Sequence, residues 1–170
     1  MLIRPERPSD FPAIHDLVAT AFATAQVSNG DEQNFVDRLR AGADYIPDLA
    51  LVAEDEGGLI GHVMLTRTFV ATAAGSRSLL LLAPLCVLRQ RRRRGVGAQL
   101  VGEALRQARE RGHEAVVLVG NPAYYARFGF RPSTAFGIAN QNGIPSEFVM
   151  ALELVRGALA GAAGAIRFAT

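Results

Sequence analysis

One stretch of the chain, residues 76–120, limits what the protein can fold into more than any other. It opens with "SRSLLLLAPLCV", which is apolar on both faces and therefore predicts a central strand of a sheet. Apolar residues then recur at steps of three and four up to a stop at Gly112, as on one face of a helix. "EAVVLVG" predicts a second strand. A strand, a helix and a strand in this order form a parallel crossover unit.

The segments on either side predict a mixed α/β fold around this central sheet. We expect a first strand at 2–4, helices at 9–22 and 31–42, and two strands around a glycine turn at 49–55 and 59–70. Two further strands, plausibly antiparallel, are predicted at 130–139 and 146–155. The alanine- and glycine-rich residues after them predict a loosely packed tail that leads into a final short strand. We therefore expect a single domain over 1–170, with its core at 2–155 and its tail at 156–170.

Composition places the chain among soluble globular proteins. It has 170 residues, of which 49% are apolar and 20% charged. Its single cysteine, Cys86, rules out an internal disulfide and favours a reducing compartment. The first residues lack a secretory signal, and the longest apolar run, at 79–88, is half of what a membrane span needs. We expect a cytoplasmic protein without membrane contact, and no metal, because no His/Cys/Asp cluster has metal-ligand spacing.

An unusual run of arginines, "RQRRRRGVGAQL" at 89–100, joins the central strand to the helix. The formal net charge is +2 and the five arginines contribute +5, so the rest of the chain carries −3. A nucleic-acid-binding protein usually spreads basic residues along a face and places aromatic residues among them. Here a single turn is basic. We therefore expect no nucleic-acid partner, although an arginine-rich nucleic-acid-binding module remains the least favoured alternative.

The two glycines after the arginines predict an anion site. The first N–H groups of a helix have no partner within the helix, and the helix dipole places partial positive charge there. Gly95 and Gly97 let the backbone bend and let a ligand approach closely. A dinucleotide-binding fingerprint would need a glycine in place of Leu100, and a P-loop would need a lysine, which the chain lacks. The alternative is a tight connection with a solvated run of charge.

Two motifs in order resemble the GNAT superfamily of N-acetyltransferases, and within it the bacterial YhbS-like group. One is Arg92-Arg93-Arg94-Gly95-Val96-Gly97 after the central strand, and the other is Tyr125-Ala-Arg-Phe128-Gly129-Phe130. The resemblance covers nearly the whole chain and is strongest over 78–131. It implies a mixed central sheet with flanking helices, in which the central strand and the strand after the crossover helix splay apart. One departure is Leu88-Arg89, where the family often has Asp-Pro or Glu-Pro.

The resemblance also implies acetyl-coenzyme A as co-substrate. Main-chain groups of the central strand would bind the pantetheine arm, amides from about Arg93 to Ala98 the diphosphate, and one or more arginines the nucleotide's extra phosphate. The implied cofactor-binding residues are Leu85, Cys86, Val87, Arg92, Arg93, Arg94, Gly95, Val96, Gly97, Ala98, Asn121, Tyr125 and Phe128. For Asn121 a turn-initiating role before Pro122 is an equal alternative.

Family members use a tyrosine at the position of Tyr125 to protonate, or hydrogen-bond to, the departing thiolate. A phenol with a pKa of about 10 stays protonated at neutral pH and can act as this acid. The alternative is an aromatic plug over the end of the sheet, which Tyr124 fits better. For Cys86 an acyl-carrying role is disfavoured, because no neighbour is evident that would lower the pKa of its thiol.

The implied reaction is direct transfer of an acetyl group to a primary amine of a small molecule or peptide. Glu32 and His62 are candidate bases, against the alternatives of a helix-terminal charge and a packed strand histidine. The family contacts its acceptor through segments equivalent to 24–33 and 137–146, which carry no recognisable specificity here. A non-catalytic acyl-coenzyme A sensor stays open as an alternative, and so does a homodimer formed through the C-terminal strands.

Overall fold

The computed structural model describes residues 1–25 and 28–168, and these fall into two compact units. Within that range, the first unit comprises residues up to 66 together with 83–107, and the second comprises 67–82 together with the residues from 108 onward. Residues 26 and 27, inside the segment expected to contact the acceptor, and the last two residues of the tail lie outside the described part. The single domain predicted over 1–170 stays a prediction.

The sheet of the first unit has the strand order β1-β2-β3-β4. Its strands are β1 (Leu2–Pro5), β2 (Tyr45–Asp55), β3 (Gly58–Thr72) and β4 (Gly75–Val87), and the last two continue into the second unit. β1 and β3 both pair antiparallel with β2. The glycine turn predicted at 56–58 is confirmed, while β2 begins four residues before the predicted strand and contains an irregularity between Tyr45 and Ala50.

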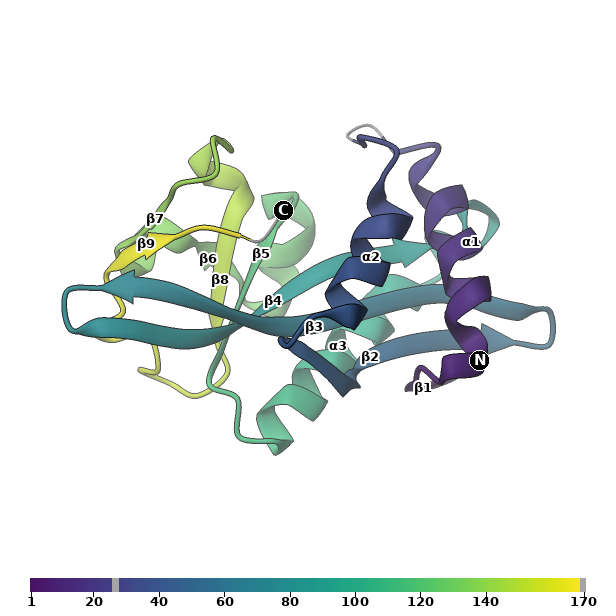
Figure 1. The fold of residues 1–170 in the computed structure, drawn as a ribbon, viewed down its shortest axis with the longest axis horizontal. Coiled ribbons are helices and arrows are strands. Elements are labelled where there is room, and N and C mark those ends of the chain that lie inside the picture. Colours follow the sequence, from purple (N-terminus) through teal and green to yellow (C-terminus); the bar gives the residue numbers. More distant parts are fainter. Residues whose placement is uncertain (26–27, 169–170) are drawn as a thin grey trace. The chain divides into compact units, whose positions relative to one another are not determined.

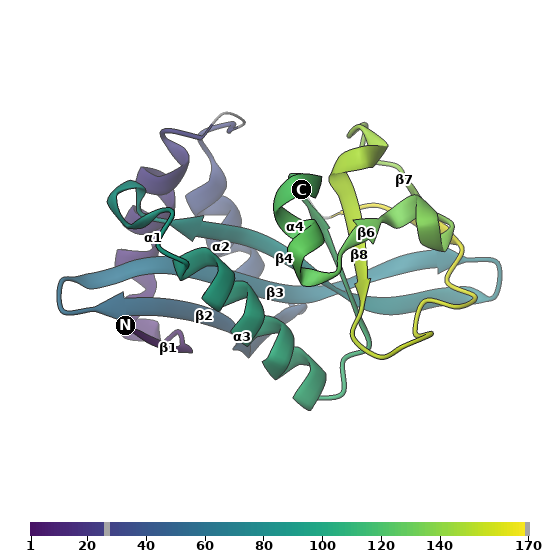
Figure 2. The same cartoon turned by 180° about the vertical axis from the view of Figure 1, so that it is seen from behind.

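Helices cover both faces of this sheet. α1 (Phe11–Phe22) and α2 (Glu32–Ala41) lie on one face, and α3 (Val96–Glu110) lies on the other (Figures 1 and 2). On the first face, apolar residues of both helices pack against β2, β3 and β4, and the core members are Ile14, Leu17, Val18, Ala21, Val36, Ala50, Val52, Met64 and Cys86. On the other face Gly61 lets α3 approach, because a Cβ there would lie 2.8 Å from Leu100 Cδ1.

The second unit contains the crossover pairing predicted from the sequence. β5 (Ala115–Val119) is parallel to β4 at Leu80↔Val116 and Leu81↔Val117. On its other side β5 pairs antiparallel with β8 (Val149–Glu153), and β8 pairs antiparallel with β6 (Arg131–Pro132). The predicted antiparallel arrangement of the late strands is therefore confirmed. Together the two units give the mixed α/β fold with flanking helices that the sequence predicts.

The single strand predicted over 130–139 is wrong. The chain forms the short β6, a 3-10 turn at Ser133–Phe136, and then β7 (Ile138–Asn140). Pro132 cannot donate a main-chain hydrogen bond, and Gly137 has a φ of +72°, so the segment cannot continue as one strand. β7 pairs in parallel with β9 (Gly164–Ile166), whereas β6 pairs with β8.

The final short strand predicted at the end of the chain is confirmed as β9, but the loose packing predicted for the tail that leads into it is wrong. Leu159, Ala162 and Ile166 are buried, and β9 is held between β7 and the antiparallel β3. A Cβ at Gly164 would overlap the carbonyl oxygen of Ala71. The small residues thus allow close main-chain approach. None of the helices within residues 1–25 and 28–168 combines the length and the apolar character needed to cross a membrane.

Candidate active site

The arginine and glycine run forms a sharp turn in the first unit. After β4 the chain makes a 3-10 turn at Arg89–Arg91 and then turns again before α3 begins at Val96. Two residues of this turn have left-handed backbone conformations, Arg93 with a φ of 61° and Gly95 with a φ of 79°. Glycine adopts this conformation freely, whereas for arginine it costs about 1–2 kcal/mol. Arg93 is therefore held in place by the surrounding contacts.

The turn presents the first main-chain amides of α3. The Gln99 N–H donates to the Gly95 carbonyl at 3.0 Å, which begins the hydrogen-bond ladder of the helix. The N–H groups of Val96, Gly97 and Ala98 precede this ladder, and the helix dipole adds partial positive charge. Val96 is buried and fixes the helix start, while Gly97 and Ala98 are partly exposed. The arrangement suits an anion with several oxygen atoms, such as a diphosphate.

The arginines of the run are used in different ways. Arg91 forms an ion pair with Asp55 at 2.8 Å, whereas Arg89, Arg93 and Arg94 are exposed. Arg92 is one of the implied cofactor-binding residues, and its guanidinium donates to the carbonyl oxygens of Val87 and Ala21, at 3.0 and 2.7 Å. Both acceptors are main-chain carbonyl groups, one in the last turn of α1 and one at the end of β4.

The end of β4 offers main-chain groups, and its cysteine is a buried thiol. Cys86 is buried on the face that α1 and α2 cover, and burial raises the pKa of its thiol to about 12. A thiol with this pKa is almost entirely protonated at neutral pH, which opposes an acyl-carrying role. Leu85 and Val87 are partly buried, and the Val87 carbonyl already accepts from Arg92. The expectation that these three residues bind a pantetheine arm stays a prediction.

In the second unit, the tyrosine motif forms a short capped helix, α4 (Pro122–Tyr125). Asn121 caps it, because its side-chain oxygen accepts from the Ala123 N–H at 2.9 Å. This is the turn-initiating role that the sequence left as one of two alternatives for Asn121. Gly129, with a φ of +91°, ends the 3-10 turn that follows. The local sequence thus fixes the direction in which Tyr125 leaves the backbone.

Aromatic rings and a glycine surround Tyr125. Its ring centroid lies 5.9 Å from that of Phe130, 6.3 Å from that of Phe128 and 4.9 Å from that of Tyr124. This burial, with a smaller contribution from Tyr124, raises the pKa of Tyr125 to about 12. The phenol therefore keeps its proton across the physiological range, as a general acid must before the transfer.

An exposed apolar edge lies beside the tyrosine motif. β5 pairs with β8 through Val119↔Val149, whereas its pairing with β4 reaches only Leu81↔Val117. Val119 is 43% exposed and Phe148 is 39% exposed, although both are apolar. The end of β5 thus has the features of a strand edge that can receive an extended ligand with amide groups. The short ladder agrees with the predicted splay of the two parallel strands.

Gly120 makes a close packing contact with Tyr125 that the sequence did not indicate. A Cβ there would overlap the Tyr125 ring, so the ring lies directly against the Gly120 backbone. The only sequence signal for this contact was a glycine immediately before Asn121-Pro122, a combination that by itself predicts a turn.

Gly120→Ala is expected to displace the Tyr125 ring and to lower kcat about 10- to 100-fold, because small misplacements of catalytic groups are costly. Steady-state kinetics would measure this effect. The control is Gly102→Ala, since a Cβ at Gly102 meets no atom within 4 Å. An unchanged kcat in Gly120→Ala would mean that the placement of the ring does not matter.

Neither candidate base has the properties of a strong base. The Asn29 N–H donates to Glu32 at 3.0 Å, and hydrogen bonds to Ser28 and nearby main-chain groups outweigh the desolvation of Glu32 and lower its pKa. Glu32 is thus a weak base at the start of α2, where its charge favours the helix. His62 is fully buried on β3, and its Nε2 lies 2.8 Å from Glu6 Oε2. The packed strand histidine is the interpretation that these contacts favour.

His62 belongs to a buried polar cluster that the sequence did not predict. The Glu6 carboxylate accepts from Arg40 at 2.7 Å and from the Tyr45 hydroxyl at 2.8 Å, in addition to its contact with His62. Together these contacts outweigh desolvation and lower the pKa of Glu6 to about 2. No local pattern marks the cluster, because its members are separated by up to 56 residues along the chain.

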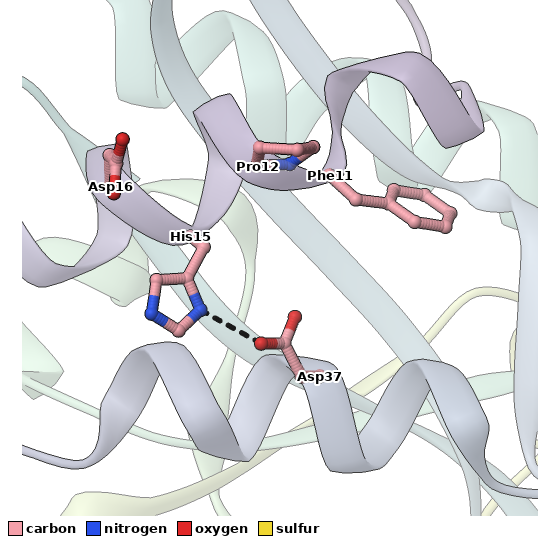
Figure 3. A pocket seen from close by; sticks show the side chains of 5 residues that line it. All are labelled: Phe11, Pro12, His15, Asp16 and Asp37. Carbon is pink, nitrogen blue, oxygen red and sulfur yellow. Dashed lines mark hydrogen bonds and ion pairs between the residues drawn. The ribbon is translucent and has the colours of Figure 1, made fainter.

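The cluster continues to the surface through the two helices. Arg40 also donates to Asp37 at 2.8 Å, and the other Asp37 oxygen lies 2.8 Å from His15 Nδ1. Figure 3 shows the His15 ring on α1 and the Asp37 carboxylate on α2 pointing toward each other. With Phe11, Pro12 and Asp16 they line a shallow surface pocket. The contacts join α1, α2 and the sheet. Within residues 1–25 and 28–168, no group of three or more His, Cys, Asp or Glu residues could hold a metal.

Known proteins are similar to this chain in sequence. Residues 2–133 match the family model described as an acetyltransferase (GNAT) domain. The uncharacterized N-acetyltransferase YhbS of Escherichia coli K12 is 39% identical over 131 residues, which cover 76% of this chain and 73% of YhbS. The uncharacterized N-acetyltransferase YjhQ of the same strain is 29% identical over 140 residues, which cover 82% of this chain and 72% of YjhQ.

Solved structures agree with this assignment. The crystal structure of Escherichia coli YhbS in complex with CoA matches with a TM-score of 0.86 and 31% identity, covering 99% of this chain and 89% of that one. A GNAT family acetyltransferase from Brucella melitensis, in complex with acetyl-CoA, matches with a TM-score of 0.74 and 31% identity, covering 89% and 86%. The motifs, the fold and the relatives lead to one conclusion: this chain belongs to the GNAT family of N-acetyltransferases.

Proposed function

We propose that this protein transfers the acetyl group of acetyl-CoA directly to a primary amine. The observation that carries the proposal is the start of α3, where three main-chain amides precede the helical ladder beside exposed arginines. The residues present fit a diphosphate-containing co-substrate, because these amides can bind the diphosphate while Arg93 and Arg94 add positive charge. The relatives support the same ligand, since YhbS binds CoA and the Brucella protein binds acetyl-CoA in their crystals.

Residues of the turn between β4 and α3 and residues of the tyrosine motif have separate roles in this proposal. In the first unit, Val96, Gly97 and Ala98 bind the diphosphate, and the main chain of Leu85, Cys86 and Val87 binds the pantetheine arm. In the second unit, Asn121 and Phe128 shape the tyrosine motif, and Tyr125 is the general acid. Asn121 acts through its cap of α4, and Phe128 through its ring beside Tyr125. Acetyl-CoA supplies an activated thioester, and the protein supplies orientation and a proton donor.

The proposed step balances without a further reactant. The neutral amine attacks the thioester carbon, a carbon–nitrogen bond forms and the carbon–sulfur bond breaks. The departing thiolate takes the proton of the Tyr125 hydroxyl, and the nitrogen loses a proton to water. Tyr125 then regains its proton from solvent. No covalent acyl-enzyme is required, in agreement with the raised pKa of the Cys86 thiol.

The acceptor that we propose is an amine with a low pKa. Deprotonation at pH 7 costs about 4.6 kcal/mol for a lysine-like amine and about 1 kcal/mol for an α-amine. Glu32 has a lowered pKa and His62 is buried against Glu6, so neither is suited to remove a proton from a lysine-like amine. An α-amine needs much less help, and water can accept its proton. A small-molecule or peptide α-amine is therefore favoured over a lysine side chain.

A two-part experiment tests the proposal. The melting temperature is first measured with acetyl-CoA, which at 100 times its Kd is expected to stabilise the fold by about 2.7 kcal/mol. Thiol release is then followed with two matched peptides, one with a free N-terminus and no lysine, and one with a blocked N-terminus and a single lysine. We expect faster release with the first peptide near neutral pH.

Each outcome separates one part of the proposal from the rest. Binding of acetyl-CoA without thiol release across a broad amine panel would identify a non-catalytic sensor of acyl-CoA. The absence of any shift in melting temperature would overturn the proposal. Faster release with the lysine peptide would keep the acetyl transfer and overturn the proposed acceptor class.

A further inference from the structure

We infer that Arg92 positions the diphosphate-binding turn and does not itself contact the phosphates. The inference rests on the proposed function and deepens it, because it divides the arginine run into anchoring and ligand-directed residues. The sequence offers no such division, since five similar arginines occur within six positions. The contacts of the guanidinium groups in the structure distinguish the anchoring arginine from the others.

Three hydrogen bonds fix Arg92 at the base of the turn. Its Nε donates to the Val87 carbonyl at 3.0 Å and its Nη2 to the Ala21 carbonyl at 2.7 Å, while its main-chain N–H donates to the Arg89 carbonyl at 3.2 Å. Val87 ends β4 and Ala21 lies in the last turn of α1. The planar guanidinium therefore bridges a strand end and a helix end, and its charge is favourable at the carbonyl end of α1.

The neighbouring backbone explains why the turn needs an anchor. Arg93 follows directly and has a φ of 61°, a left-handed conformation that residues with a side chain rarely adopt. Such a residue persists only where neighbouring contacts hold it. Arg92 supplies such contacts to the ends of β4 and α1. The ion pair between Arg91 and Asp55, at 2.8 Å, supplies one to the end of β2. The result is a fixed entry into α3 that presents its first amides.

Arg94 offers a matched comparison, because it is also an arginine of the turn and is exposed. We expect Arg94 to act through its charge on the nucleotide phosphates. Loss of a charge that attracts phosphate weakens binding most at low salt, since ionic strength screens exposed charges. Loss of an anchor weakens binding equally at all salt concentrations. The salt dependence of affinity therefore distinguishes the two roles.

The test is a calorimetric titration of CoA into the unmutated protein, Arg92→Met, Arg92→Lys and Arg94→Met at several salt concentrations. Arg92→Met is expected to raise Kd about tenfold, as for the loss of charge-assisted hydrogen bonds, and to change the slope of log Kd against log salt less than Arg94→Met does. Arg94→Met is expected to make this slope shallower. Arg92→Lys keeps the charge but cannot bridge both carbonyls, so we expect it to lose most of the affinity that Arg92→Met loses.

Kinetics provide a second readout that general destabilisation would not reproduce. In Arg92→Met, KM for acetyl-CoA is expected to rise while kcat at saturation stays within about twofold, because Tyr125 is untouched. Full affinity in Arg92→Lys, or a salt slope in Arg92→Met as shallow as that in Arg94→Met, would make Arg92 a phosphate ligand and overturn the inference. If Arg92→Met does not fold, Arg92→Lys decides the question alone. Failure of the unmutated protein to bind CoA would instead remove the proposed function.

Discussion

Tyr125→Phe is expected to lower kcat about 100-fold or more while leaving the Kd for CoA nearly unchanged. The substitution removes the hydroxyl and keeps the ring that packs against Gly120 and Phe130. General acid catalysis contributes about 100- to 10,000-fold, so loss of the proton donor falls on the chemical step. Single-turnover thiol release measures this step apart from product release.

The pH dependence follows from the raised pKa of Tyr125. Burial raises this pKa to about 12, so the acid form dominates at every pH at which the protein is usefully assayed. Activity is therefore expected to rise with pH as the amine loses its proton, and to show no decline from Tyr125 up to about pH 10. An alkaline decline near pH 8 that disappears in Tyr125→Phe would contradict this assignment.

The neighbouring tyrosine provides the matched control. Tyr124 carries the same hydroxyl one residue earlier, and its ring makes edge contacts with Tyr125 and Phe128. Tyr124→Phe is expected to keep kcat within about threefold, since it leaves the proposed acid in place. If both variants release thiol at the unmutated rate, departure of the thiolate does not require a tyrosine. If only Tyr124→Phe is slow, the acid has been assigned to the wrong ring.

The second large effect is expected in stability, from Glu6→Gln. The Glu6 side chain is fully buried and interacts with Arg40, Tyr45 and His62. Removing one partner of a buried ion pair costs about 3–5 kcal/mol, because the remaining charge is left without compensation. In a protein of this size such a loss lowers the melting temperature by roughly 10 °C. Thermal unfolding followed by circular dichroism measures it.

The same carboxylate makes stability depend on pH in the acid range. Its pKa falls from 4.5 in the unfolded chain to about 2 in the folded protein, because Arg40, His62 and Tyr45 favour the charged form. For a lowered pKa, the stabilisation is fully present above the unfolded value and is lost as the pH falls from about 4.5 towards 2. We expect Glu6→Gln to have a flatter stability profile across this window.

Glu56→Gln is the control for this prediction, because this substitution removes the same charge from an exposed position at the hairpin turn. Its melting temperature is expected to stay within about 2 °C of that of the unmutated protein. A Glu6→Gln variant as stable as Glu56→Gln, with the same acid profile, would show that the buried cluster contributes no net stability.

Local patterns in the sequence were sufficient for the crossover unit and for both GNAT motifs. The apolar run of β4, the helical spacing after Gly97 and the capped turn at Asn121 each depend on neighbours within a few residues. Such short-range preferences do not depend on the rest of the fold. The parallel pairing of β4 with β5 follows from them, because a strand, helix and strand of these lengths have few other arrangements.

The late part of the chain was predicted less well, because its strands are fixed by distant partners. Residues 130–139 have the composition of one strand, yet Pro132 and Gly137 interrupt it and β7 finds β9 as its partner. The alanine- and glycine-rich tail looks weakly structured by composition. Only the approach of β9 to Ala71 on β3 shows that small residues are required there. Strand pairing across such separations is not encoded in any short window.

By itself, the sequence determined that a strand is followed by a helix after a glycine turn, and that a tyrosine lies four residues before the Gly129-Phe130 pair. Only the tertiary structure decided which arginine of the exposed turn donates to main-chain carbonyls, and that the Glu6 carboxylate lies in a buried cluster that lowers its pKa. The physical reason is one of range. Helix starts, caps and turns depend on adjacent dihedral angles, whereas hydrogen-bond partners and burial depend on distant residues, such as Ala21, which lies 71 positions before Arg92.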